Sequence, residues 1–303
     1  MTGQRRRPLL ALALGSGSAR GWAHIGVIRK LNEAGIHPDI VCGTSIGALV
    51  GAAYAARELE RFEHWTRSLN VRHVISLMDF HLNGGMLKGE RLMAFFQRHF
   101  LDCPIEDLHL PYAAVATDLH TGQEVWLREG STVEAVRASI ALPGLFSPVW
   151  IQGRLLVDGG LVNPVPVSLA RALGADIVLA VDLNSDILGR HLLGSGEQKV
   201  RSSSLGAAWR DRLPEALSAL LPAQMTETDE PPLPPLLDTL AGSINIMQVR
   251  ITRSRMAGDP AEVVISPRLA SMGLLDFHRA DHAIKLGVEA AETALPALRQ
   301  LGI

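Results

Sequence analysis

A glycine-flanked serine between an apolar run and an alanine-rich run constrains this chain more than any other feature. Residues 39–54 read Asp-Ile-Val-Cys-Gly-Thr-Ser-Ile-Gly-Ala-Leu-Val-Gly-Ala-Ala-Tyr, with Ser45 at the break. A short apolar run followed by a helical pattern predicts a strand, a sharp turn and a helix. In such a turn, side chains at Gly43 and Gly47 would collide with neighbouring backbone, and the serine hydroxyl is lifted out of the sheet. Ser45 is therefore a candidate nucleophile at a helix start, where free N–H groups favour negative charge.

A glycine-containing loop precedes this turn. An apolar run at 9–14 ends in residues 15–21, Gly-Ser-Gly-Ser-Ala-Arg-Gly, and apolar residues then recur at helical spacing. The outline also fits a dinucleotide-binding fingerprint, but Arg20 stands where the third glycine belongs, and no acidic residue follows at the expected distance. We favour the other interpretation, a loop that turns its N–H groups toward one point and forms an oxyanion hole. Loss of one such donor typically costs about 3 kcal/mol of transition-state stabilisation.

A carboxylate follows a later hairpin. The segment 149–157 predicts two short strands that deliver Asp158, Gly159 and Gly160 at their end. Two glycines directly after a carboxylate allow close approach of another backbone, and the apolar strand before it indicates partial burial. The alternative is an ordinary turn in which Asp158 bonds only to the amides that follow it.

No histidine is singled out as the base for Ser45. His64, His73, His81 and His99 lack ligand or triad spacing, so surface or capping roles are the simpler interpretation. The remaining arrangement is a dyad in which Asp158 acts directly on Ser45. An aspartate with an ordinary pKa near 4 is a weak base, so the dyad requires burial to make the carboxylate more basic.

The loop, the serine turn and the aspartate, in this order, resemble the patatin-like phospholipase family in its bacterial branch. The resemblance covers roughly residues 10–171, including Ala138-Ser139, Pro143-Gly144 and the Asn-Pro-Val-Pro run at 163–166. It implies Ser45 as nucleophile and Asp158 as its partner, with no metal or cofactor. The oxyanion hole it implies is formed by Gly15, Gly17, Ser18 and Ala19, and the supporting motif residues are Arg20, Gly21, Gly43, Gly47, Gly159 and Gly160. The family's loop often has a glycine where this chain has Ser18.

The order of predicted elements favours a three-layer α/β/α sandwich with a largely parallel central sheet. We expect a catalytic core over 9–188, a flexible Pro/Ser/Gly-rich insertion or lid over 189–241, and a C-terminal strand and helix that complete the core over 242–303. Further helices are predicted at 58–69, 88–100, 164–173 and 276–298, and a hairpin at 112–127. Within the insertion, Leu213, Leu217, Leu220 and Leu221 share one helical face, which would pack on the body, serve as a lid or touch a lipid surface.

Composition narrows the class of protein only modestly. The chain has 303 residues and a formal net charge of -2, so its overall charge does not indicate a nucleic-acid-binding protein. Two cysteines, Cys42 and Cys103, support neither a disulfide framework nor a zinc site, so we expect a cytoplasmic protein, with transient contact to a membrane surface. The basic and apolar N-terminus is similar to a short secretion signal, but cleavage there would remove the glycine loop. No stretch approaches the roughly 18 apolar residues of a membrane span.

The expected activity is that of a serine lipid acyl hydrolase, of phospholipase A or lysophospholipase type, which cleaves carboxylic esters through an acyl-enzyme. Two alternatives stay open: a carboxylesterase or thioesterase on soluble acyl substrates, and a regulatory binding protein that has kept the motifs. Arg20 would either orient the loop or attract a phosphate head group. The sequence leaves the oligomeric state undetermined.

Overall fold

A mixed sheet forms the centre of the protein. The computed structural model describes residues 6–77, 90–99, 103–187 and 236–303. Its eight strands run in the order β5-β6-β3-β2-β1-β7-β8, with β4 paired to β3. The parallel strands are β1 (Leu10–Leu14), β2 (Ile40–Thr44), β3 (Tyr112–Asp118), β7 (Ile177–Val181) and β8 (Val263–Ile265). The antiparallel strands are β4 (Glu124–Leu127), β5 (Val149–Ile151) and β6 (Arg154–Asp158).

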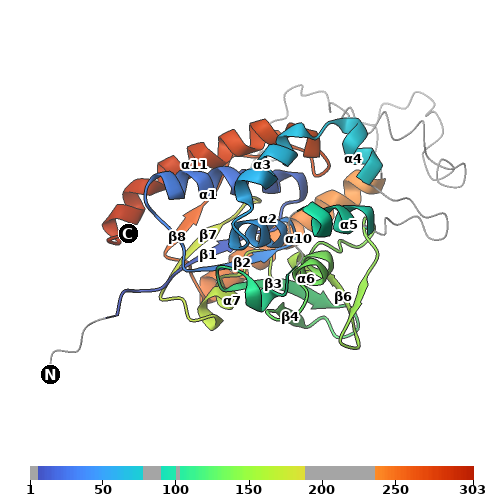
Figure 1. Ribbon diagram of the computed structural model, residues 1–303, viewed down its shortest axis with the longest axis horizontal. Coiled ribbons are helices and arrows are strands. Elements are labelled where there is room, and N and C mark those ends of the chain that lie inside the picture. The colour runs from blue at the N-terminus through green and yellow to red at the C-terminus, as the bar shows by residue number, and fades with distance from the viewer. Residues whose placement is uncertain (1–5, 78–89, 100–102, 188–235) are drawn as a thin grey trace, which may run out of the picture.

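Helices cover both faces of the sheet (Figure 1). Successive side chains of a strand point to opposite faces, so Leu12 and Leu14 of β1 join one core cluster, while Ala11 and Ala13 join the other. The first cluster includes residues of α1 (Ala23–Glu33), α2 (Ile46–Ala55) and α11 (Ala280–Gln300). The second includes α7 (Val167–Ala172) and the C-terminal end of α10 (Leu236–Gly258). This arrangement confirms the predicted three-layer α/β/α fold.

Shorter elements complete the layers. They are the helices α3 (Leu59–Ser68), α4 (Val71–Leu77), α5 (Glu90–His99) and α6 (Thr132–Ser139) and the 3-10 turns η1 (Ser18–Trp22), η2 (Ile105–Asp107), η3 (Gly159–Leu161) and η4 (Phe277–Arg279). Both predicted hairpins are confirmed, since β4 pairs with β3 and β5 with β6. The helix predicted from Pro164 begins only at Val167, after Pro164 and Pro166, which lack the N–H that a helix interior needs. The last helix begins at Ala280, after η4.

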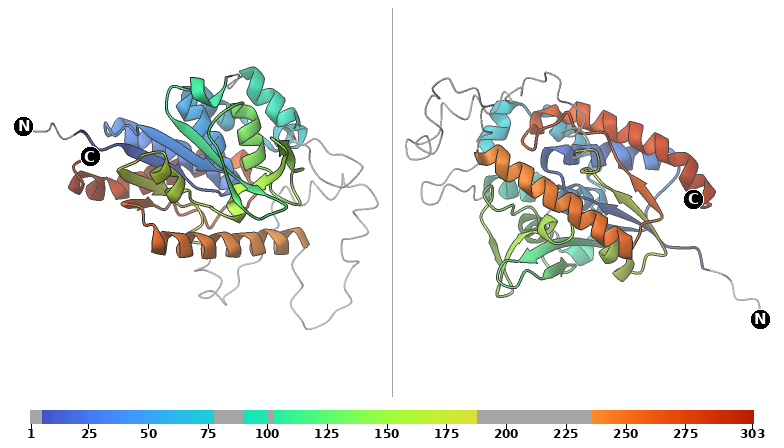
Figure 2. Two further views of the ribbon diagram at one scale, coloured as in Figure 1. Left: turned by 90° about the horizontal axis from the view of Figure 1, so that it is seen from below. Right: turned by 180° about the vertical axis from the view of Figure 1, so that it is seen from behind.

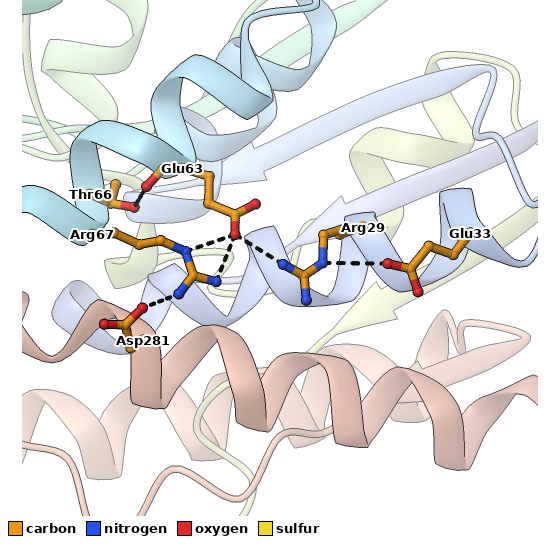
Figure 3. A network of polar contacts seen from close by, with 6 residues as sticks. All are labelled: Arg29, Glu33, Glu63, Thr66, Arg67 and Asp281. Carbon is orange, nitrogen blue, oxygen red and sulfur yellow. Dashed lines mark hydrogen bonds and ion pairs between the residues drawn. The ribbon is translucent and has the colours of Figure 1, made fainter.

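An ion-pair network ties α3 to the helices of the outer layer (Figure 3). One carboxylate oxygen of Glu63 accepts from Arg29 of α1 at 3.0 Å and from Arg67 of α3 at 2.7 Å. Arg67 also donates to Asp281 of α11. Each exposed pair contributes little, about 1 kcal/mol or less, but shared charges hold the three helices in one arrangement. Trp65, also on α3, packs against the rings of Trp22, Phe62, Phe95 and Phe96.

Helix α10 corrects one prediction. Residues 236–241 belong to its first turns, whereas the sequence placed them in a flexible insertion. The sequence does not mark this helix with an apolar stripe, because the polar Gln248 and Thr252 are buried on it beside Val249, whereas Leu240, Ile246 and Met247 are exposed. Figure 2 shows α10 running along the molecule over most of the sheet's width. The remainder of the predicted insertion, including its four leucines, lies outside the described residues.

Candidate active site

Ser45 lies on a strained turn between β2 and α2. Its backbone has φ 57° and ψ -125°, a conformation that residues with side chains rarely adopt. A Cβ on Gly47 would stand 2.2 Å from the Leu14 carbonyl oxygen, and one on Gly43 would stand 2.4 Å from the Ala48 nitrogen. The glycines therefore let the turn sit directly against strand β1. The predicted strand, turn and helix are confirmed.

Sheet register brings Asp158 to the level of Ser45. Thr44, at the end of β2, pairs with Val115 of β3, and the next residue of β3, Ala116, pairs with Asp158 at the end of β6. Strand β3 extends past the end of β2 by Ala116, Thr117 and Asp118, and β6 runs back along this extension, so Asp158 lies just beyond the end of β2. The side chains of Ser45 and Asp158, which come from the two strands that flank β3, therefore meet above β3.

The Ser45 hydroxyl donates a hydrogen bond of 2.6 Å to Oδ2 of Asp158. The other carboxylate oxygen accepts from the Gly160 amide at 2.7 Å, so the turn after Asp158 does bond its side chain, as the alternative interpretation required, while leaving one oxygen for the serine. Asp158 is 1% exposed. Burial raises the pKa of its carboxyl to about 6, against the lowering effect of the bonds from Ser45 and Gly160.

Ser139 is a supporting residue whose role the sequence did not indicate. Its hydroxyl accepts from the Ser45 amide at 2.8 Å and donates to the Val115 carbonyl at 2.6 Å. It lies at the end of α6 and is fully buried. A hydroxyl can accept and donate at once, so this single group ties the serine turn to strand β3. The sequence marked Ala138-Ser139 as part of the family resemblance but assigned Ser139 no role.

The glycine loop offers two free amides. The Gly15 amide donates to Val181 and the Ala19 amide to Leu274, both at 3.0 Å, and the Ser16 amide donates to Pro164. In the described part of the chain, the amides of Gly17 and Ser18 donate to no protein acceptor. This corrects the predicted oxyanion hole at two of its four residues, because the N–H groups of Gly15 and Ala19 already donate to backbone carbonyls. Gly17 and Ser18 remain as candidates.

Ser18 fits a position that favours glycine. Its φ is 51°, in the left-handed region, and its hydroxyl donates to the Leu274 carbonyl at 2.6 Å. Side-chain bonding of this kind offsets part of the conformational cost for a small polar residue. Gly21, the last loop glycine, lies against Ile46 of the serine turn, where a Cβ would stand 2.2 Å from the isoleucine side chain.

Arg20 is buried beneath the loop and is not free to meet a head group. Its Nε donates to the Gly17 carbonyl at 3.1 Å and its Nη2 donates to Asn245 at 2.8 Å. Burial lowers its pKa to about 10, and the charges of Asp186 and Asp182 act in the opposite direction. Arg20 therefore stays protonated at neutral pH, and its contacts support the loop-orienting role.

An apolar pocket opens beside Ser45 and Asp158. It encloses about 930 Å³ including its mouth, and Gly17 and Ser18 line it with them. Most of its wall is hydrophobic, with Trp22, Leu49, Trp65, Leu142, Phe146 and Phe277 among the lining residues. Binding sites for small molecules are commonly lined in this way, by apolar and aromatic side chains with a few polar groups. The chemistry available here is therefore attack on a group whose attached chain is apolar.

Within the described part of the chain, no histidine lines the pocket or bonds to Ser45 or Asp158. His64 and His73 are exposed on α3 and α4 and line no part of the pocket, and His81 lies outside the described residues. His24, which the sequence did not single out, is fully buried and lies 2.7 Å through Nε2 from the Gly15 carbonyl. Burial lowers its pKa to about 4, so it is neutral and donates to that carbonyl. Among the described residues, no cluster of acidic, histidine or cysteine side chains suits a metal ion.

The fold and the serine turn together define an α/β protein with a hydrolase-type nucleophile turn. Residues 12–171 match the family described as patatin-like phospholipase, and the chain belongs to this family. An uncharacterized NTE family protein of Mycobacterium bovis is 33% identical over 338 aligned residues, which cover 96% of this chain and 92% of that protein. The human patatin-like phospholipase domain-containing protein 6 is 39% identical over 184 residues, 58% of this chain and 13% of the human protein.

Among solved structures, that of VipD from Legionella pneumophila covers 96% of this chain and 67% of its own, with a TM-score of 0.47 and 12% identity. Membership of the patatin-like phospholipase family supports a lipid hydrolase activity. In the described part of the chain, no helix is both long and apolar enough to cross a bilayer.

Proposed function

We propose that this protein is a serine lipid acyl hydrolase of phospholipase A or lysophospholipase type, with Ser45 as nucleophile and Asp158 as general base. The observation that carries the proposal is the 2.6 Å hydrogen bond between Ser45 and a buried Asp158 at an apolar pocket. A nucleophilic hydroxyl needs a base within hydrogen-bond reach, and here the base is the carboxylate itself. Its raised pKa makes it a better proton acceptor than an ordinary aspartate.

The reaction follows from these groups. Asp158 takes the proton of Ser45 as the serine oxygen attacks the ester carbonyl carbon, and the amides of Gly17 and Ser18 hold the negative oxygen that forms. The bond to the leaving alcohol breaks, and Asp158 returns the proton to that alcohol. A water molecule then gives a proton to Asp158 and attacks the acyl-enzyme. The fatty acid leaves, and Ser45 recovers its proton from Asp158.

The apolar pocket favours an acyl chain over a polar acyl group. Burying apolar surface contributes about 0.8 kcal/mol per CH₂ group, so a pocket walled by Trp22, Trp65 and Phe277 gains affinity with each added carbon. Among the residues that the structure describes, no cationic side chain lines it, and Arg20 is held beneath the loop. The substrate class is therefore a carboxylic ester with a long aliphatic acyl group.

Labelling with a fluorophosphonate, followed by intact mass and peptide mapping, tests the proposal. We expect one adduct on Ser45 in the parent protein, none in Ser45→Ala, and a strongly slowed reaction in Asp158→Asn. Rates on micellar lysophospholipid, a monomeric short-chain ester and an acyl thioester then assign the substrate class. A folded parent protein that forms no adduct would contradict the enzyme assignment and favour a binding protein.

A further inference from the structure

The two free amides of the loop belong to two successive peptide units. The Gly17 N–H shares a peptide plane with the Ser16 carbonyl, and the Ser18 N–H shares one with the Gly17 carbonyl. Both peptides are trans, as are all the peptides described. In a planar trans peptide the N–H and the C=O point in opposite directions. Whatever holds the two carbonyls therefore sets where the two N–H groups point.

The Ser16 carbonyl is held by Asn184. The Asn184 side-chain amide donates to it at 3.3 Å and also donates to Oε1 of Gln248 at 3.1 Å. Asn184 and Gln248 are 1% and 6% exposed, so water competes little for these bonds. Asn184 lies just beyond β7, and its own amide donates to Asp182 at 2.9 Å. Gln248 thus fixes the orientation of the amide that holds the Ser16 carbonyl.

The Gly17 carbonyl accepts from the backbone amide of Arg20 at 3.2 Å and from the Arg20 side chain. Arg20 donates to it through Nε and donates through Nη2 to Oδ1 of Asn245. The guanidinium is planar and rigid, so a bond at Nη2 also fixes the direction of Nε. Asn245 and Gln248 are three residues apart on α10, which places both side chains on one face of that helix.

We propose that Asn245 and Gln248 are positioning residues that aim the two amides of the oxyanion hole. Each acts through one buried side chain, Asn245 through Arg20 and Gln248 through Asn184. The inference rests on the proposed function and adds a role for α10, which Figure 2 shows running along the sheet. Polar side chains on the inward face of a helix are unfavourable unless they are hydrogen-bonded, and the bonds to Arg20 and Asn184 supply partners for Asn245 and Gln248.

Direct contact with the substrate is the competing role, because Asn245 and Gln248 also line the pocket. The two roles differ in what each substitution removes. Asn245→Asp keeps the oxygen that accepts from Arg20, whereas Asn245→Leu removes it. Gln248→Met removes the acceptor for Asn184 at nearly constant length. Ser243→Leu is the matched control, since Ser243 is exposed on α10 and its hydroxyl donates to the Thr239 carbonyl of the same helix.

The experiment uses the full chain and measures kcat and KM on a monomeric short-chain ester, together with inhibition by a trifluoromethyl ketone. That ketone adds to the serine and forms a tetrahedral oxyanion, so its affinity reports the oxyanion hole. We expect kcat to fall about 10- to 100-fold in Asn245→Leu and Gln248→Met, less than for outright loss of a donor, with KM nearly unchanged. The affinity for the ketone should fall by a similar factor in these two variants. Asn245→Asp and Ser243→Leu should stay within a few-fold of the parent.

Two results would overturn the inference. One is a raised KM with unchanged kcat and unchanged ketone affinity, which indicates substrate contact. The other is a loss of kcat in Asn245→Asp that is as large as the loss in Asn245→Leu. Thermal unfolding checks each variant, and Asn245→Ser, too short to reach Arg20, replaces the leucine variant if that one fails to fold. A parent protein that is not labelled at Ser45 would refute the proposed function itself, whereas labelled parent and fully active variants would refute only this inference.

Discussion

The hydroxyl of Ser45 lies 2.6 Å from a carboxylate oxygen of Asp158, a residue 113 positions later in the chain. The contact crosses strand β3 and depends on β6 running antiparallel to it. The carboxylate oxygen that does not meet Ser45 is held by the Gly160 amide. Asp158 therefore has one oxygen fixed by its own turn and one presented to the serine, which is the geometry a base needs.

The pH dependence of acylation should follow the titration of Asp158. Only the ionised carboxylate accepts the Ser45 proton, and its pKa is raised to about 6. We expect kcat/KM to fall as pH drops below about 6 and to level off above it, because kcat/KM reports groups of the free enzyme. Rates on a monomeric ester between pH 4.5 and 8.5 measure this profile. A midpoint near 4 would mean that Asp158 is not desolvated in solution.

Asp158 should also make the protein less stable at neutral pH. Its folded pKa lies above its unfolded value near 3.9, so the native state binds more protons between about pH 4 and 6, and stability falls as pH rises through that window. Two pKa units correspond to about 3 kcal/mol. Urea unfolding should show Asp158→Asn to be more stable than the parent at pH 7.5, with the gain shrinking at pH 4.5. An equal difference at both pH values would contradict this.

Close packing at the serine turn predicts a severe effect for Gly47→Ala. The new Cβ would meet the Leu14 carbonyl oxygen at 2.2 Å and the Gly15 carbonyl oxygen at 2.7 Å, and both are backbone atoms. We expect more than about 3 kcal/mol of lost stability, near the upper end for single substitutions. Gly242→Ala is the matched control, because it lies within α10 with nothing within 4 Å of the added Cβ. That variant should be as stable as the parent or slightly more so.

Local sequence signals indicated the two proposed catalytic residues because each lies beside glycines that its turn requires. Ser45 needed flanking glycines, and Asp158 needed a strand before it and glycines after it. The partners of the loop amides could not be predicted, since Val181 and Leu274 approach Gly15 and Ala19 only in the folded chain. Helix α10 was not predicted for a related reason: polar Gln248 and Thr252 occupy buried positions on it, so its sequence lacks the apolar period that marks an ordinary helix.

The pocket wall should set the acyl-chain length that the enzyme accepts. Val74, on α4, is 5% exposed and lines the pocket, so Val74→Phe places extra atoms where a long acyl chain would lie. Hydrolysis of a series of esters with 4 to 16 acyl carbons measures the effect. We expect the ratio of long-chain to short-chain kcat/KM to fall about tenfold, since excluding two CH₂ groups forfeits roughly 1.6 kcal/mol. Val71→Phe, on the same helix but outside the pocket, serves as the control. If both variants change the ratio equally, the effect comes from helix α4 as a whole, and the acyl chain lies elsewhere.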